Sequence, residues 1–509
     1  MPASGGPAMT EATANEHPLE PIFHPRSIAI AGVPRDNSTR QRSGFLASLM
    51  DHGYHEERPL YPVNPNADTI AGLRAYPSVR DIEGPVDHVI SSVPASITPQ
   101  LVEDSIAKGV RSIHFYTAGF AEIGDPDLVR MQQDVIGRAT EAGIRVFGPN
   151  CMGLYVPAER ITFQGDFPTE PGNVMVISQS GGNSMDIVHG LARRGVRFSR
   201  AVSFGNGEDV DAADLFDYAA SDPTSEYVVA YLESSARGRA TFEALRRCGY
   251  AKPTIVLKGG MTDAGGRAAN SHTGSLAGSR EVFEAMCRQA GVALAESMEE
   301  LHDLLIGVTT NTRLVRGERA LLLGGGGGFS VLAADAIART GLDLPPLDEE
   351  TTARLRELMP VAGNSIRNPI DASHLAGDRA ESYRTLLEIG AHARDLDVLL
   401  VMAGGPPDFA PRPKEEQADL DYAREREERR RRRDRRAIEQ LIELQESSHH
   451  PVVALRRART GSAEQIDDEV LADAYAHGLG VFPTVERAAR TVAQLLRWRR
   501  RREGLPELF

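Results

Sequence analysis

From residue 27 onward the chain alternates short apolar runs, rich in β-branched residues, with longer amphipathic segments. In the first part of the chain this pattern predicts strands at 27–33, 59–63, 87–93, 112–117 and 144–147, and helices at 45–50, 97–108 and 128–142. Strands this apolar are typical of sheets buried on both faces, and helices that cover both faces connect parallel strands. The pattern therefore predicts an α/β fold that begins with a Rossmann-like domain.

Two further units repeat this alternation. The second predicts strands at 173–177, 198–204, 227–232 and 253–258, with helices at 183–194 and 212–220; the third begins at residue 319 and continues with strands at 397–402 and 451–454. A chain of 509 residues is too long for one core. We expect a disordered tail at 1–19, a Rossmann-like domain at 20–152, and parallel-sheet domains at 153–312 and 313–509.

Composition excludes several classes of function. The net charge of −14, from 57 basic and 71 acidic residues, disfavours general nucleic-acid binding. Three scattered cysteines are too few for a disulfide framework or a metal cluster, so we expect a reducing cytoplasm and no metal site. We also expect no membrane span and no leader peptide, because no apolar run approaches about 20 residues and the first residues lack a charged and then apolar pattern.

Ligands of parallel sheets bind at the carboxyl ends of the strands. The loop after the first strand, GVPRDNSTRQRSG, lacks the G-x-G-x-x-G pattern of dinucleotide-binding proteins. Its arginines, Arg35, Arg40 and Arg42, fit either phosphate binding or a solvated basic turn.

The second unit carries the strongest chemical signal. Its first strand is followed by SQSGG and then a helix, an arrangement in which free backbone N–H groups and the helix dipole bind anions. Glu233 follows a later strand, and His272 lies in GGRAANSHTGSLAGS at 265–279. This small-residue segment fits either a surface loop or a mobile loop that carries a nucleophilic imidazole. The predicted shared sheet edge favours the second interpretation.

The third unit adds two unusual segments. Five glycines at 324–328 lie between a strand and a helix, where they fit a phosphate-binding turn or close packing. The segment 414–436 contains REREERRRRRDRR, whose Glu-to-Arg pairs four residues apart predict a solvated helix or helical insertion at about 412–437. Binding of RNA or membranes is the sharper alternative for this segment. The basic residues at 497–502 predict an amphipathic terminal helix or a partner contact.

Several strings together resemble one known family. They include YPVNPNADTIAGLRAYPSV, SVPAS, TAGFAE, GPNCMG, GNVMVISQSGG, VSFGNGEDVDAADL, KPTIVLKGGMTDAGGRAANSHTGSLAG and, further on, LLLGGGGGFSVLAADA and NPID. The chain resembles the α subunit of NDP-forming acyl-CoA synthetases of the ADP-forming acetate–CoA ligase type, and more distantly that of succinyl-CoA synthetase. The resemblance covers residues of about 20 to 375 closely.

The resemblance implies a CoA-binding domain followed by two flavodoxin-like domains, and a reaction through an acyl phosphate and a phosphohistidine. It identifies His272 as the phosphorylated residue and Glu233 as its carboxylate partner. It also implies further site residues: Ser180, Gly181, Gly182 and Gly274 for phosphate, Asn150 and Gly153 for the acyl group, and Gly32, Val63, Asn64, Val93, Pro94 and Ala95 for CoA.

Nothing in the chain resembles the ATP-grasp domain that binds ATP or ADP with Mg²⁺ in this family. The resemblance therefore implies a separate ATP-grasp β subunit, a hetero-oligomer, and a small carboxylic acid and CoA as substrates. Two other hypotheses stay open: an acyl or carbamoyl transferase on the same scaffold, and a non-catalytic CoA-binding protein. The altered first loop and SQSGGNS in place of SQSGALG favour the transferase, whereas His272 and Glu233 favour the ligase. The altered loop and Asn66, found where relatives usually carry lysine, are departures that bear on how CoA binds.

Overall fold

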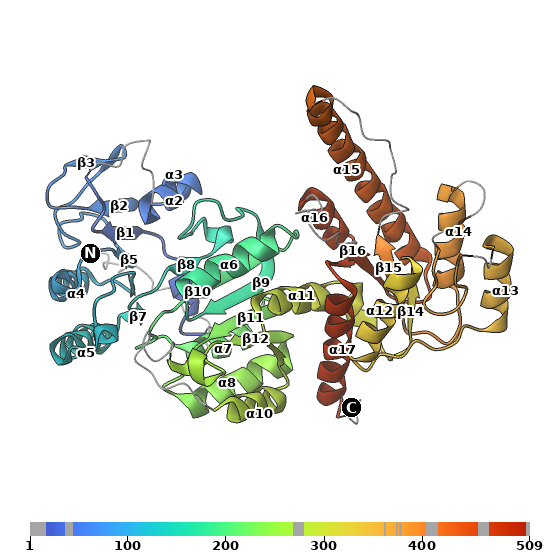
Figure 1. Ribbon diagram of the computed structural model, residues 1–509. Coiled ribbons are helices and arrows are strands. Elements are labelled where there is room, and N and C mark those ends of the chain that lie inside the picture. Colours follow the sequence, from blue (N-terminus) through green and yellow to red (C-terminus); the bar gives the residue numbers. More distant parts are fainter. Residues whose placement is uncertain are drawn as a thin grey trace, which may run out of the picture.

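The computed structural model describes residues 17–35, 44–267, 279–360, 363–372, 375, 379–403, 416–456 and 468–504. Within these ranges the chain is an α/β protein with three sheets of mainly parallel strands, each flanked by helices (Figure 1). The expected tail at 1–19 lies mostly outside the described residues. None of the described helices combines the length and the apolar character that a bilayer span requires.

The first sheet has the strand order β2-β1-β5-β6-β7 and is parallel throughout. Its strands are β1 (Ile28–Ala31), β2 (Leu60–Val63), β5 (His88–Ser91), β6 (Ser112–Phe115) and β7 (Arg145–Phe147). The helices of this unit are α1 (Glu20–Phe23), α2 (Phe45–Asp51), α3 (Tyr54–Glu57), α4 (Thr98–Lys108) and α5 (Pro126–Glu141). A small antiparallel hairpin, β3 (Thr69–Ile70) with β4 (Leu73–Arg74), follows β2. All five predicted strands are confirmed, each shortened at one or both ends.

The second sheet has the order β13-β12-β11-β9-β10-β8. Its strands are β8 (Gly153–Tyr155), β9 (Pro171–Ser178), β10 (Phe198–Ser203), β11 (Tyr227–Leu232), β12 (Thr254–Lys258) and β13 (Ala293–Ala295). Only the edge strand β8 runs antiparallel, against β10. The helices are α6 (Gly181–Ala192), α7 (Ala212–Ser221), α8 (Gly238–Ala251), α10 (Arg280–Ala290) and α11 (Met298–Thr309).

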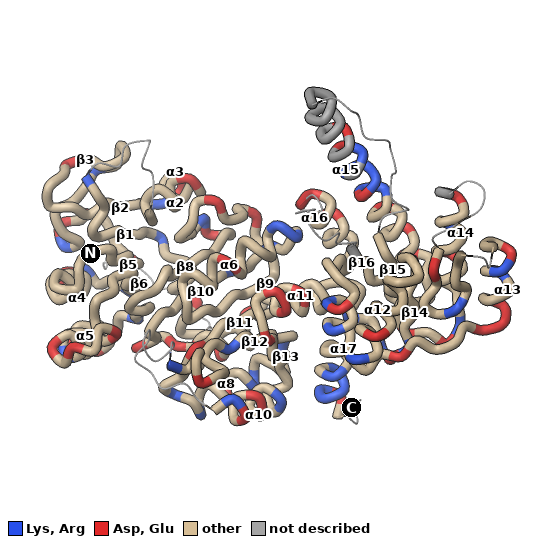
Figure 2. Tube along the Cα trace, viewed as in Figure 1, with Lys and Arg blue, Asp and Glu red and all other residues tan. Residues whose placement is uncertain are grey.

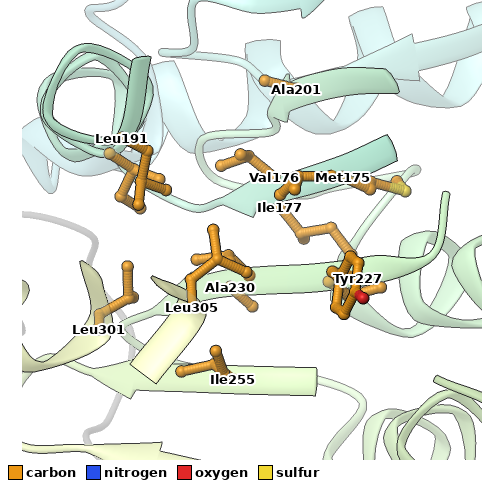
Figure 3. Close-up of a cluster of buried hydrophobic side chains, with 14 of the residues drawn as sticks. Met175, Val176, Ile177, Leu191, Ala201, Tyr227, Ala230, Ile255, Leu301 and Leu305 are labelled. Atoms are coloured by element: carbon orange, nitrogen blue, oxygen red, sulfur yellow. The ribbon is translucent and has the colours of Figure 1, made fainter. Parts of the chain in front are cut away.

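The core of this unit forms between the sheet and its helices. Figure 3 shows Ile177 of β9 and Ala230 of β11 near Leu191 of α6 and Leu305 of α11. These four side chains are fully buried. Central strands such as β9 and β11 are buried on both faces, and their sequences are therefore continuous apolar runs.

The third sheet has the order β14-β15-β16-β17 and is parallel. Its strands are β14 (Ala320–Leu323), β15 (Val398–Ala403), β16 (Val452–Arg456) and β17 (Gly480–Phe482). The helices of this part are α12 (Gly327–Ala338), α13 (Glu349–Leu358), α14 (Arg379–Ala391), α15 (Glu416–Ser447), α16 (Asp468–Ala476) and α17 (Val485–Arg502).

Helix α15 contains the charged segment and continues well beyond it. The predicted pairs are formed between Arg429 and Glu425 (3.2 Å) and between Arg432 and Glu428 (2.9 Å), so the prediction of a solvated helix is confirmed for these turns. Further along, Ile438 and Leu441 are buried. The basic part of the helix projects away from the third sheet, whereas its last turns pack against that sheet (Figures 1 and 2).

A buried ion-pair cluster joins the second and third units. Asp303 of α11 is 2% exposed and accepts hydrogen bonds from Arg194 of α6 (2.9 Å) and from Arg487 of α17 (2.5 and 2.8 Å). Helix α17 follows the last strand of the third sheet, so this cluster holds the end of the chain against the second unit. The predicted terminal helix at 497–502 is confirmed as the end of α17.

We predict that Asp303→Asn lowers the thermal stability of the chain. The substitution leaves two partly buried arginines without a countercharge, and the loss of one partner of a buried pair costs about 3 kcal/mol. We expect a fall in Tm of roughly 4 °C or more, measured by calorimetry. The control is Glu243→Gln, because Glu243 pairs with an almost fully exposed arginine, Arg239. Equal, small shifts for both variants would contradict the assigned role of Asp303.

Candidate functional site

The turn after β9 and the turn after β11 are joined by the side chain of Gln179. Its Oε1 atom accepts hydrogen bonds from the backbone N–H groups of Glu233 (2.7 Å) and Ser234 (2.9 Å), and its Nε2 atom donates to Ser234 Oγ (3.1 Å). Its own N–H donates to the carbonyl of Tyr231 (3.0 Å). Because β9 and β11 are parallel neighbours, both turns lie at the same carboxyl edge. The structure thus brings Glu233 beside the SQSGG turn.

The SQSGG turn opens helix α6 two residues earlier than the sequence predicts. Ser180 caps the helix, with its Oγ atom accepting the N–H of Asn183 (3.3 Å), so Gly181 and Gly182 form the first helical turn. A Cβ atom at Gly181 would lie 2.7 Å from the side chain of Met152, which only glycine avoids. Gly182 is exposed, and a Cβ atom there would meet nothing within 4 Å. This helix start is therefore accessible to an anion.

A buried lysine supports the Glu233 turn from the neighbouring strand. Lys258, the last residue of β12, donates from Nζ to the Glu233 carbonyl (2.6 Å). Burial lowers the pKa of Lys258, although the negative charge of Glu233 acts in the opposite direction. Burial, with a contribution from Glu233, raises the pKa of Tyr231 to about 12. Lys258 and Tyr231 both lie beside the turn that contains Glu233. Neither was predicted as a site residue.

The segment with His272 and Gly274 lies outside the described residues, which end at Arg267 and resume at Ser279. The chain leaves the carboxyl edge toward this segment through Gly259, whose N–H donates to the carbonyl of Leu232 (2.8 Å). A Cβ atom at Gly259 would lie 2.5 Å from the Tyr231 hydroxyl. The KGG string therefore allows the backbone to pass close to the Glu233 turn.

The residues expected for CoA lie along the carboxyl edge of the first sheet. They end or follow the adjacent strands β2, β1 and β5: Gly32, Val63, Asn64, Val93, Pro94 and Ala95. Gly32 has a φ of +90°, and a Cβ atom there would lie 2.8 Å from the carbonyl carbon of Ser92. Asn64 donates from its side chain to the carbonyl of Val33 (2.7 Å). Arg35 is exposed beside this edge, whereas Arg40 and Arg42 are not among the described residues.

The GPNCMG string connects the two sheet edges. The side chain of Thr117 donates to the carbonyl of Val93 (2.8 Å), and the carbonyl of Thr117 accepts the N–H of Asn150 (3.0 Å). On the other side, a Cβ atom at Gly205, after β10, would lie 2.4 Å from the Asn150 carbonyl oxygen. Asn150 thus lies between the edge expected for CoA and the second sheet.

Gly153 ends this connection and begins strand β8. Its φ is +81°, and a Cβ atom there would lie 2.4 Å from the ring of His114, a fully buried histidine of β6. Its neighbour Met152, which packs on Gly181, donates its N–H to Ser203 Oγ (3.1 Å). Asn150 and Gly153, the two residues expected at the acyl group, therefore lie in a connection that contacts both the first and the second sheet.

The glycine run of the third unit favours close packing over phosphate binding. Helix α12 begins at Gly327, and a Cβ atom there would lie 3.3 Å from the carboxylate of Asp371, which belongs to NPID. Asn368 of the same string bonds the N–H of Leu322 (3.2 Å) and the carbonyl of Ala320 (2.8 Å). An acidic side chain thus lies beside this helix start, where it complements the dipole.

No group of three or more His, Cys, Asp or Glu side chains with the spacing of a metal site is present in the part of the chain that the structure describes.

Known protein families match the first and the second unit of the chain. A family model described as a CoA binding domain matches residues 26–157, and one described as a succinyl-CoA ligase like flavodoxin domain matches residues 171–306. The alpha subunit of acetate–CoA ligase (ADP-forming) II from Pyrococcus furiosus is 33% identical over 388 residues, which are 76% of this chain and 83% of the relative.

Other relatives are longer. The ADP-forming acetate–CoA ligase of Methanocaldococcus jannaschii is 33% identical over 358 residues, 70% of this chain, and the match spans 49% of that relative. A solved structure of the dinucleotide forming acetyl-coenzyme A synthetase 1 from Ca. Korarchaeum cryptofilum, in complex with phosphate and ADP, matches with a TM-score of 0.73 and 29% identity. That match covers 95% of this chain and 97% of the other.

We predict that Gln179→Met loosens the Glu233 turn. The variant keeps the length of the side chain but leaves two backbone donors without their acceptor, at a cost of about 1–3 kcal/mol. Hydrogen exchange should therefore accelerate at the amides of Glu233 and Ser234 by at least about tenfold. Gln100→Met is the control, because Gln100 is exposed and its side chain donates to Asp104 within the same helix, away from the Glu233 turn. Unchanged exchange at both amides would show that another contact holds the turn.

Proposed function

Because the chain belongs to the family of the alpha subunits of ADP-forming acetate–CoA ligases, we propose that it is the α-type subunit of an acyl-CoA synthetase. In the direction of acyl-CoA use, phosphate displaces CoA from the thioester and forms an acyl phosphate. His272 then takes the phosphoryl group and releases the carboxylic acid. Transfer of the phosphoryl group from His272 to ADP gives ATP. The reverse sequence joins the acid to CoA with cleavage of ATP to ADP and phosphate.

The main observation in support of this proposal is that the Gln179 side chain accepts two hydrogen bonds from the Glu233 turn, next to the start of α6. A carboxylate that accepts a hydrogen bond from one ring nitrogen of His272 fixes the tautomer and leaves the other nitrogen as the nucleophile. The same carboxylate stabilises the cationic ring after phosphorylation. The N–H groups of Gly181 and Gly182 are suited to hold the phosphate oxygens during transfer.

The chain's contacts also support roles for the other proposed residues. CoA would lie along Gly32, Val63–Asn64 and Val93–Ala95, and its thioester would reach the connection that contains Asn150 and Gly153. Hydrogen bonds through Thr117 link this connection to the CoA edge, and Met152 packs on the start of α6. The acyl carbon would thus lie near the helix start that binds phosphate, as direct transfer requires.

We further propose that nucleotide and Mg²⁺ bind to a separate ATP-grasp β subunit. The match spans 83% of a relative that is named as an alpha subunit. It spans only about half of relatives that are named as the acetate–CoA ligase itself, without a subunit. The three cysteines are buried free thiols, which fits a cytoplasmic location. A small carboxylic acid is the proposed substrate, and a hetero-oligomer the proposed assembly.

We predict that phosphate from γ-labelled ATP enters this chain only with the β partner present and is absent in His272→Ala. Glu233→Gln should lower the rate of labelling by roughly 10²–10⁴-fold, since the ring loses its charged partner. His189→Ala, at a half-buried histidine paired with Asp166, is the matched control. Labelling of His272→Ala would remove this histidine from its role. Acyl exchange between CoA and acids without nucleotide or partner would favour the transferase hypothesis instead.

We predict that Gly32→Ala weakens CoA binding by at least about tenfold. The added methyl group would push against the Ser92 backbone and displace the loops after β1 and β5. Calorimetric titration of the full chain with CoA measures the dissociation constant. Gly72→Ala is the control: Gly72 also has a positive φ, +83°, but no atom lies within 4 Å of the added group. Equal affinity of both variants would contradict the proposed CoA edge.

A further inference from the structure

A cavity lies beside the candidate site, at the junction between the second and third units. Its volume is about 550 Å³. One wall is α10, the opposite wall is the end of α17, and the floor is the segment 292–296, which contains β13. Lys258, which holds the Glu233 turn, lines its inner end. The cavity therefore borders the candidate site and shares Lys258 with it, while its other lining residues come from other elements.

The walls of this cavity are strongly basic. Four arginines line it, Arg280 and Arg288 on α10 and Arg497 and Arg501 on α17, and Lys258 adds a fifth positive charge. The lining acids are Glu284, which pairs with Arg280 at 2.7 Å, and Glu296. We call this cavity the arginine pocket. Its lining carries an excess of three positive charges within a chain whose net charge is −14.

The helix periodicity shows that this charge is directed into the cavity. Arg280, Glu284 and Arg288 lie four residues apart on one face of α10, and Arg497 and Arg501 lie four apart on one face of α17. Like charges that face one another from two helices repel. Val292 and Ala293 of the floor are buried, and such apolar surroundings strengthen electrostatic interactions inside the cavity.

An anion between the two helices would convert this repulsion into attraction. Guanidinium groups bind phosphate and carboxylate through paired N–H donors, and arginines on both walls match a ligand with two separated anionic groups. We propose that the arginine pocket binds a small polyanion with at least two phosphate or carboxylate groups, distinct from the phosphate held at the start of α6. Such a ligand bridges α10 to α17 and stabilises the junction between the two units.

The chain contains its own reporter for this site. Trp498 is the single tryptophan of the sequence and follows Arg497 on α17. Its indole N–H donates to the carbonyl of Gly291 (2.6 Å), the residue before the pocket floor, and the guanidinium of Arg502 lies 5.1 Å from its ring centroid. A ligand that draws α17 toward the floor changes the surroundings of this ring. Tryptophan fluorescence of the full chain therefore reports on the pocket without any enzymatic activity.

The test titrates the full chain with pyrophosphate and, separately, with citrate at about 0.15 M salt, with Trp498 fluorescence as the signal. We expect a saturable change. Arg288→Gln with Arg501→Gln should raise the dissociation constant at least about tenfold. Arg239→Gln with Arg500→Gln removes the same amount of charge from residues that do not line the pocket, and it should leave the constant unchanged. A response to pyrophosphate alone identifies a phosphate compound as the ligand, and a response to citrate alone identifies a polycarboxylate.

Two results would overturn the proposal: no saturable change with either anion, or the same dissociation constant for both pairs of substitutions. Gly182→Asp separates this site from the proposed phosphate site, because its carboxylate repels anions from the start of α6. The Trp498 response should persist in this variant, and its loss would assign the signal to the α6 site. The Trp498 fluorescence change does not depend on phosphoryl transfer. A result that disproves phosphoryl transfer would therefore leave the arginine pocket standing, and the reverse also holds.

Discussion

The hydrogen bonds of one amide side chain set the geometry of the candidate site. Gln179 follows a central strand, β9, and fixes two backbone donors of the turn after β11, while its own N–H donates to the carbonyl of Tyr231 in β11. A helix start and a carboxylate are thereby held at a fixed separation. Parallel pairing of β9 with β11 makes this possible, because it places both turns at one edge. Lys258 adds a third support from the next strand.

The connection between the sheet edges is equally dependent on small side chains. Gly205 and Gly181 each lie so close to the 148–153 segment that a methyl group would collide with it. Thr117 adds hydrogen bonds to the loop after β5 and to Asn150. The two edges are therefore coupled by contacts rather than by one flexible linker. Under the proposed function, a thioester bound at the first edge would meet a phosphate bound at the second without movement of either sheet.

Periodicity predicted most of the fold because the central strands are buried on both faces and read as apolar runs. The sequence analysis missed β8, β13 and β17, each of three residues; so short a run carries little period of its own, although β7, of the same length, was predicted. It also ended the charged segment near residue 437, whereas α15 continues to Ser447. The buried Ile438 and Leu441 follow directly after a dense run of charge, which hides the start of their apolar face.

The candidate site was predicted in part. Glu233 and SQSGG were recognisable because each follows an apolar strand, and strand ends converge in parallel sheets. The roles of Gln179 and Lys258 depend on which strands are neighbours in space, and sequence order does not reveal this. Gln179 belongs to the SQSGG string, and Lys258 begins the KGG string. The sequence therefore showed both residues but not the contacts that they make. The assignment of His272 stays a prediction, because its segment is outside the described residues.

Helix α15 has a consequence for how this chain can change in evolution or by engineering. Its inner turns are anchored through Ile438 and Leu441, whereas Arg431 and Arg432, further out, face solvent. Removal or addition of seven residues in the outer turns rotates the helix by only about 20° relative to the inner face. The reach of this projection can thus vary in steps of two turns while the third sheet keeps its packing. It offers an attachment point for a tag or tether.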